Sequence, residues 1–163
     1  MQKFSLDNDL KPDVDTMWGH LLDVDFQRRI HLEGLGFQKY ELESQDERGD
    51  VMHRVAQVIP RVDMPKALTK VLGDSIGYKE FVTFDRVKKD WKWHLKMSGP
   101  GAKIHVGGTI ELLPGRNESG CIRRTHFEVE CKIFGVGGLI EKTVKTETLA
   151  NYEKAAVFIN ANT

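Results

Sequence analysis

Residues 91–97 read Trp-Lys-Trp-His-Leu-Lys-Met, so that large apolar side chains alternate strictly with polar or charged ones. A period of two is typical of a β-strand with one face buried and the other in water. Trp91, Trp93 and Leu95 therefore face a core, and the lysines and the histidine between them face solvent. The segment predicts an antiparallel sheet with one apolar face.

The two segments that follow continue the pattern. Even positions of 104–112 and odd positions of 121–133 carry the apolar side chains. If Ser98 pairs with Lys103, the register of this hairpin sets Trp93 opposite Gly108 and Leu95 opposite Val106. A glycine inside a strand often marks a bend or room for a neighbour, and a simple bulge is the alternative. We expect Gly107 and Gly108 to curve the sheet and to leave space over Trp93.

Turn residues divide the chain between Phe37 and Phe134 into six predicted strands, and the alternating N-terminal residues add a seventh. Between the third and fourth strands, Pro60 and Pro65 argue against a central strand. Residues 59–76 predict a loose crossover or lid, with one or two helical turns at Met64, Leu68, Val71 and Leu72. The strands are expected at 2–8, 37–45, 50–58, 77–85, 89–98, 103–113 and 120–134.

Three helices complete the predicted order. Pro12 opens a short amphipathic helix, and a second begins near Asp25 and ends at Gly34 and Gly36. The strongest signal is a long helix over the last 27 residues, which begins after Gly137 and Gly138. Its inner stripe includes Val144, Leu149 and Tyr152 and is broad enough to cover a sheet.

Composition excludes several classes of function. The chain has 163 residues, enough for one domain over 1–163, with 24 basic and 24 acidic side chains. A balanced charge disfavours nucleic acid as a partner, and no apolar run is long enough to span a bilayer. The N-terminus lacks the apolar stretch of a secretory signal. Cys121 and Cys131 lie ten residues apart in one predicted strand, too far apart to pair. We therefore expect a cytoplasmic protein.

Polar side chains on the apolar face are the candidate functional groups. Taking Tyr78 and Val82 as inward places Glu80 inward too, and the same alternation turns Arg123 and Thr125 inward. An unpaired charge in a dry core is costly, so these groups line a wet cavity mouth, pair with each other or contact a polar ligand. The sequence does not decide which side of residues 77–85 faces inward, because Phe81 and Thr83 could face inward instead. The same holds for residues 50–58, with His53 and Gln57.

Metal and catalytic signatures are sparse. His94, His105 and His126 fall on the outward face of the predicted sheet and are too widely set for one zinc ion. The chain lacks the nucleophile elbow, the phosphate-binding loops and the zinc-protease motif. The sequence predicts no metal site, no cofactor and no catalytic residue.

The order of elements resembles the helix-grip fold of the START-like (SRPBCC) superfamily, which includes the major birch pollen allergen, START domains and polyketide cyclases. More narrowly, it is similar to an uncharacterised bacterial family, a domain of unknown function. The similar features are Pro12-Asp13-Val14, Met64-Pro65, Met97-Ser98-Gly99-Pro100-Gly101 and Gly135-Val136-Gly137-Gly138-Leu139-Ile140-Glu141. The resemblance implies an α+β fold: a curved seven-stranded antiparallel sheet wrapped around the C-terminal helix, with two short helices after the first strand and a hydrophobic cavity inside.

The leading hypothesis is a binding or carrier domain for an apolar small molecule such as a lipid, a sterol-like or an aromatic, polyketide-like compound. Apolar walls with a few polar groups suit such ligands. One alternative is a cyclase, hydrolase or isomerase that uses Glu80, Arg123 or Tyr152 as acid, base or anchor. Another is a protein-interaction module, and an outward edge strand is compatible with a homodimer. The expected ligand-binding residues are Tyr78, Glu80, Val82, Trp91, Trp93, Leu95, Val106, Arg123, Thr125, Phe127, Val129, Val144 and Tyr152.

Overall fold

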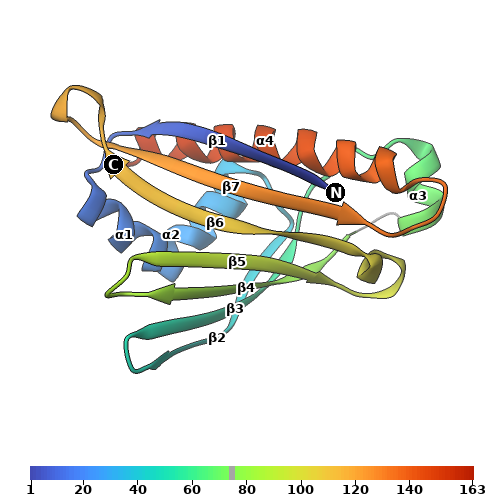
Figure 1. Ribbon diagram of the computed structural model, residues 1–163, viewed down its shortest axis with the longest axis horizontal. Helices are drawn as coiled ribbons and strands as arrows, with labels where there is room; N and C mark the ends of the chain where they lie inside the picture. The colour runs from blue at the N-terminus through green and yellow to red at the C-terminus, as the bar shows by residue number, and fades with distance from the viewer. Residues whose placement is uncertain (74–75) are drawn as a thin grey trace.

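The computed structural model describes residues 1–73 and 76–163 and shows one curved antiparallel sheet wrapped around the C-terminal helix α4, Gly137–Ala161 (Figure 1). The seven strands lie in the order β1-β7-β6-β5-β4-β3-β2. The first strand thus pairs with the last, and β1 and β2 form the two edges. The strands are β1 (Gln2–Leu10), β2 (Lys39–Arg48), β3 (Val51–Ile59), β4 (Tyr78–Asp85), β5 (Asp90–Met97), β6 (Ile104–Pro114) and β7 (Cys121–Cys131).

Two short helices follow β1, as the sequence predicts, and each begins at an aspartate cap. Asp13 accepts a hydrogen bond from the Thr16 amide at the start of α1 (Val14–Leu22), and Asp23 does the same for Phe26 in α2 (Val24–Arg29). The last turn of the second helix is wider than periodicity alone predicts. It is a π-helical turn, η1 (Ile30–Gly34).

Gly34 explains how this turn reaches the long helix. A Cβ atom at this position would lie 2.9 Å from the Cβ of Phe158 on α4, closer than real side chains approach. The absent side chain lets η1 and α4 meet.

The predicted register of the β5–β6 pair is confirmed. Trp93 lies opposite Gly108, and Leu95 lies opposite Val106. A Cβ at Gly108 would overlap the His126 carbonyl oxygen of β7 and lie 3.2 Å from Cζ2 of Trp93. The glycine thus leaves room for the indole, as expected from the sequence.

Some boundaries differ from the prediction. The last strand ends at Cys131 rather than near residue 134, and the Phe134 side chain is fully exposed in the turn before α4. The connection from β5 to β6 is a 3₁₀ turn, η2 (Gly99–Lys103), instead of a simple hairpin loop. The predicted crossover, by contrast, contains the helical turns expected there, as the short helix α3 (Lys66–Leu72), while its residues 74–75 lie outside the described residues.

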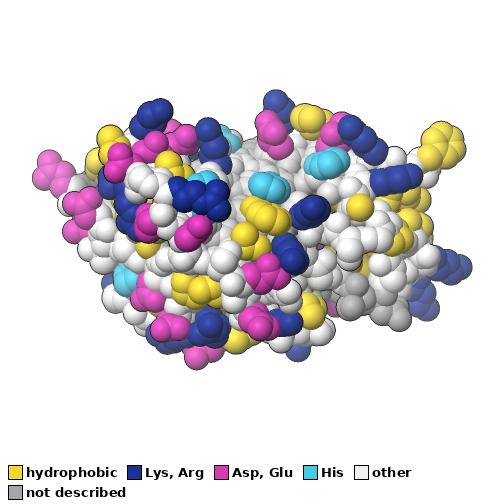
Figure 2. Space-filling view, turned by 90° about the horizontal axis from the view of Figure 1, so that it is seen from below, with side chains coloured by type: hydrophobic (Ala, Val, Ile, Leu, Met, Phe, Trp, Pro, Cys, Tyr) yellow, Lys and Arg dark blue, Asp and Glu magenta, His cyan; other side chains and the backbone are white. Residues whose placement is uncertain are grey.

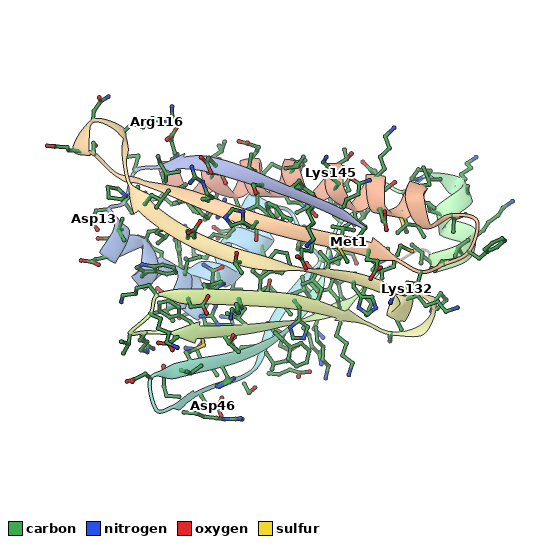
Figure 3. The ribbon with its side chains drawn as sticks, viewed as in Figure 1. Met1, Asp13, Asp46, Arg116, Lys132 and Lys145 are labelled. Atoms are coloured by element: carbon green, nitrogen blue, oxygen red, sulfur yellow. The ribbon has the colours of Figure 1, made fainter. Side chains whose placement is uncertain are left out.

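The core lies between the inner face of the sheet and the helices. The α1 helix and the hairpin turn carrying Arg116 lie at one end of the molecule, near Asp13, and Lys132 lies at the other end, near α3 (Figures 1 and 3). Lysine and arginine side chains are interspersed with carboxylates on the surface (Figure 2), with ion pairs such as Arg124–Asp7 and Lys3–Glu128 across β1 and β7. The balanced charge of the sequence is therefore largely a property of the outer surface.

Candidate ligand-binding cavity

Two adjoining cavities lie between the inner face of the sheet and α4. The first cavity, of about 140 Å³, is lined from η1, β3, β4, β5 and α4. The second cavity, of about 110 Å³, lies toward α3 and has a more apolar wall. Because the two share part of their walls, one elongated ligand could occupy both. The shared lining residues are Phe37, Tyr78, Leu95, Val106, Thr148 and Asn151.

Most of the residues that strand alternation singled out do line these cavities. Val144 lines the second cavity, and Leu149, expected on the same stripe, lines neither. The structure also shows which side chains of β4 face inward, a point that the sequence leaves undecided. The even positions turn inward, and Phe81 stacks on His94 on the outer face. The predicted residues in the first cavity are Tyr78, Glu80, Val82, Trp91, Trp93, Leu95, Val106, Arg123 and Tyr152.

Thr125, Phe127 and Val129 were expected to contact ligand, but they line neither cavity. They do face inward, and each is at most 1% exposed. The helix α4 packs directly on β1 and β7, so these side chains are covered by protein. Phe127, for example, stacks on Phe4 at a ring-centroid distance of 4.8 Å and meets Tyr152 edge-on at 4.9 Å. The first cavity opens farther across the sheet, where most of its strand residues come from β4, β5 and β6.

Several lining residues were missed from the sequence. Arg54 and His31 line the first cavity, and Thr148 and Asn151 of α4 line both. The helix residues could have been found, because they continue the helical spacing from Val144 to Tyr152. His31 gives no such signal, since its position depends on the π-helical turn.

Arg54 is buried, 2% exposed, and fastens β3 to the end of α1. Its Nη1 donates to the carbonyl of Leu21 at 3.0 Å and its Nη2 to that of Leu22 at 2.8 Å. These carbonyls end a helix, where the helix dipole is negative. Nε donates to Gln45 at 2.8 Å. The guanidinium is thus compensated by protein groups, while its flank lies over Trp91 and the cavity.

Glu80 is the carboxylate of the first cavity. No Lys, Arg or His among the described residues lies within 4.0 Å of its carboxylate, so of the three alternatives left open by the sequence, a pair between Glu80 and Arg123 is not formed. Burial raises the pKa of Glu80, and the positive charge of Arg54 opposes this effect only in part. The carboxyl therefore keeps its proton to higher pH than an exposed glutamate. Tyr78 and Tyr152 lie close enough to sense its charge.

Arg123 reaches the first cavity from β7, and its side chain is buried, with 4% exposure. Nη2 donates to Oδ1 of Asn8 at 2.9 Å and to the carbonyl of Tyr152 at 3.1 Å. The guanidinium also lies over the Tyr152 ring, 4.7 Å from its centroid. Nε has no hydrogen-bond partner in the described part of the chain.

His31 also lines the first cavity, and one of its ring nitrogens can accept a hydrogen bond. Its Nδ1 lies 2.7 Å from the carbonyl of Gln27, which can only accept, so Nδ1 carries the proton and Nε2 has the free lone pair. Burial lowers the pKa of His31 to about 4, and the ring is neutral at physiological pH. The ring stacks on Tyr40 at 4.3 Å.

Residues 1–73 and 76–163 contain no group of three or more His, Cys, Asp or Glu side chains placed to hold a metal ion. Within the same residues, no helix combines the length and the apolar character needed to cross a bilayer. Cys121 and Cys131, at opposite ends of β7, are both free thiols.

Comparison with known proteins identifies the family. A family model described as "Protein of unknown function (DUF2505)" matches residues 6–161. The chain belongs to this family. No curated protein matches the DUF2505 chain at a significant level.

Solved structures share the fold of the DUF2505 chain at low sequence identity. TTHA0849 from Thermus thermophilus is 13% identical, with a TM-score of 0.69 over 98% of this chain and 95% of that one. Norcoclaurine synthase from Thalictrum flavum is 16% identical (TM-score 0.65; 97% and 93% covered). The Zhui aromatase/cyclase from Streptomyces is 11% identical (TM-score 0.62; 97% and 93% covered). These likenesses confirm the α+β helix-grip fold.

Proposed function

We propose that the protein binds an apolar small molecule in the two cavities between the sheet and α4. The observation that carries the proposal is an apolar, tryptophan-containing wall that the long helix covers without filling the space. Trp91, Trp93 and Val106 form this wall, and a few polar groups interrupt it. An apolar cavity of roughly 150 Å³ holds a benzene ring, so each cavity suits about one ring or a short chain.

The fold supports the same proposal. Two of the similar structures are named as an aromatase/cyclase and a norcoclaurine synthase, and the first name describes the formation of an aromatic ring in a small molecule. Transport or storage fits the DUF2505 chain better than chemistry, because a binding wall is present and no catalytic motif is found in the sequence. We expect the protein to act in the cytoplasm, where both thiols stay reduced.

Native mass spectrometry of protein purified without detergent, followed by a screen of lipids and fluorophores, tests the proposal. Quenching of tryptophan fluorescence gives a second readout, because Trp91 and Trp93 line the first cavity. A matched pair of variants locates the binding. Thr148→Trp places an indole where the two cavities meet, whereas Thr146→Trp places it on the exposed side of the same helix.

We expect Thr148→Trp to weaken binding about tenfold or more and Thr146→Trp to leave it unchanged. Absence of any bound species and of any dye uptake by the wild-type protein would refute the proposal. Equal affinities of the two variants would show that the ligand binds outside the two cavities.

Glu80 favours a second candidate, an enzyme of the cyclase, hydrolase or isomerase type. A buried carboxyl with a raised pKa and no ion-pair partner within the described residues can act as a general acid or base. In that case Glu80→Gln abolishes turnover while ligand binding and the fold persist. Loss of binding together with turnover would instead assign Glu80 to ligand recognition.

A further inference from the structure

Arg123 is a buried cation without a counter-ion. No carboxylate in residues 1–73 and 76–163 lies within 4.0 Å of its guanidinium. Its protein partners, the Asn8 side chain and the Tyr152 carbonyl, are both neutral and both accept from Nη2. Burying an uncompensated charge is costly, so such a charge in a cavity wall calls for a partner outside the protein.

Two other arginines of this chain have a guanidinium charge that protein groups compensate. Arg54, equally buried, donates to two carbonyls at the negative end of α1 and to Gln45. Arg124, the next residue on β7, points outward and forms a two-pronged ion pair with Asp7 through Nε and Nη2, both at 2.9 Å. Arg123 has neither arrangement. Its Nε is an orphaned buried donor, and no hydrogen bond from Nη1 to a described residue is present.

The first cavity has another unused hydrogen-bond donor. The indole Nε1 of Trp93, a residue that lines this cavity together with Arg123, is buried and has no partner among the described residues. The hydroxyl of Thr125 is unpartnered too, but Thr125 lines neither cavity. The lining of the first cavity thus offers donors to a ligand that accepts hydrogen bonds.

We propose that the ligand is an apolar organic acid, whose carboxylate pairs with Arg123 while its aromatic or aliphatic body lies against Trp91, Trp93 and Val106. This inference rests on the proposed function and names its ligand class. A guanidinium and a carboxylate make a charge-assisted hydrogen bond, about twice as strong as a neutral one. This bond would supply the counter-charge that the protein itself does not.

Glu80 does not oppose such an anion. It lies on β4, whereas Arg123 lies on β7, and no ion pair joins the two side chains among the described residues. Burial raises the pKa of Glu80, which favours its uncharged form. The lining that an acid would meet therefore contains two arginines and a carboxyl group that can be uncharged, so its net charge is positive.

The experiment compares 1-naphthoate with 1-naphthamide, two probes of the same shape that differ in charge. Binding to the wild-type protein is measured at pH 7 by calorimetry and by tryptophan quenching. Arg123→Gln removes the buried charge, and Arg124→Gln is the matched control, because it removes the same charge from the next, outward-facing position. Arg123→Lys keeps a charge at the site.

We expect the acid to bind about tenfold or more tightly than the amide to the wild type and to Arg124→Gln. In Arg123→Gln this preference falls to about one, through loss of acid binding, and Arg123→Lys retains part of it. If Arg123→Gln does not fold, a crystal structure of the wild-type complex decides, with the naphthoate carboxylate expected within about 4 Å of the guanidinium.

Equal affinity of the acid and the amide for the wild type overturns the inference and leaves the proposed function intact. A preference that persists in Arg123→Gln, or a carboxylate found away from Arg123, overturns it as well. Binding of neither probe also overturns it, and native mass spectrometry then judges the proposed function separately, by whether any apolar species is bound.

Discussion

Replacing Arg54 by methionine should strongly destabilise the fold, because this one side chain fastens β3 to α1. Methionine keeps most of the apolar stem that lies against Trp91, but it removes the hydrogen bonds to Leu21, Leu22 and Gln45. The exposed Gln45 side chain regains water. The two carbonyls at the end of α1 lose their charged donor, and the Leu21 carbonyl belongs to a buried residue.

The magnitude follows from these contacts. Hydrogen bonds from a charged donor contribute about 1.5–3 kcal/mol each, and the two to the carbonyls have no replacement. Relief of the desolvated charge offsets part of this loss, which leaves a net cost of about 3–4 kcal/mol. For a domain of this size, each kcal/mol lowers the melting temperature by about 2–4 °C, so we expect a decrease of roughly 6–16 °C.

Urea denaturation followed by circular dichroism and tryptophan fluorescence measures the effect. Arg48→Met is the control, because Arg48 lies in the β2–β3 hairpin with a side chain that is 71% exposed and pairs with the neighbouring Asp46. It should change the free energy of unfolding by less than about 0.5 kcal/mol. A loss of less than about 1 kcal/mol in Arg54→Met would refute the reasoning that Arg54 is a structural clamp.

Three further predictions concern pH and packing. Burial lowers the pKa of His31 in the folded protein to about 4, whereas in the unfolded chain it has the ordinary value near 6.5. Between pH 6.5 and pH 4 the unfolded chain therefore binds more protons than the folded protein. Wild-type stability should then fall by about 3 kcal/mol more than that of His31→Gln from pH 7 to 4, as measured by urea denaturation. Glu80 affects stability in the opposite direction. Its pKa is raised in the folded protein, so the free energy of unfolding decreases as the pH rises through that pKa. Glu80→Gln should exceed the wild type in stability at pH 8 and lose this advantage near pH 4, whereas a constant difference would contradict the linkage. Gly108→Ala should cost about 1–3 kcal/mol in thermal unfolding, while Gly138→Ala, with open space around it, should cost nothing.

Strand alternation predicted the fold because one face of the sheet is nearly uncharged along β5, β6 and β7. It failed to assign the sides of β3, since residues 51–58 carry valines on both faces. Arg54 is inward and His53 outward for reasons that lie in α1, whose carbonyls receive the guanidinium. Such a contact joins residues 33 positions apart, and no periodic pattern in the sequence indicates it.

The candidate site was predicted only as a face, not as a cavity. Alternation places Phe127 and Trp93 on the same side of the sheet, but it does not say which of them the long helix covers. The position of α4 over β1 and β7 decides this, and it depends on close contacts such as the one between Gly34 and Phe158. Such contacts involve the shape of two surfaces rather than a pattern in either one.

Two of the charged groups of the first cavity, Arg123 and Glu80, should also act on each other through the ligand. An anion beside Arg123 would disfavour a second negative charge in the same cavity, and the pKa of Glu80 would rise further in the complex than in the free protein. Binding of an acid should then be linked to proton uptake wherever Glu80 is ionised in the free protein, so the affinity increases as the pH falls. Calorimetry of 1-naphthoate binding in two buffers of different ionisation enthalpy measures this uptake directly. Glu80→Gln should abolish it, and an unchanged uptake in that variant would show that the coupled proton belongs to another group, with His31 as the next one to test.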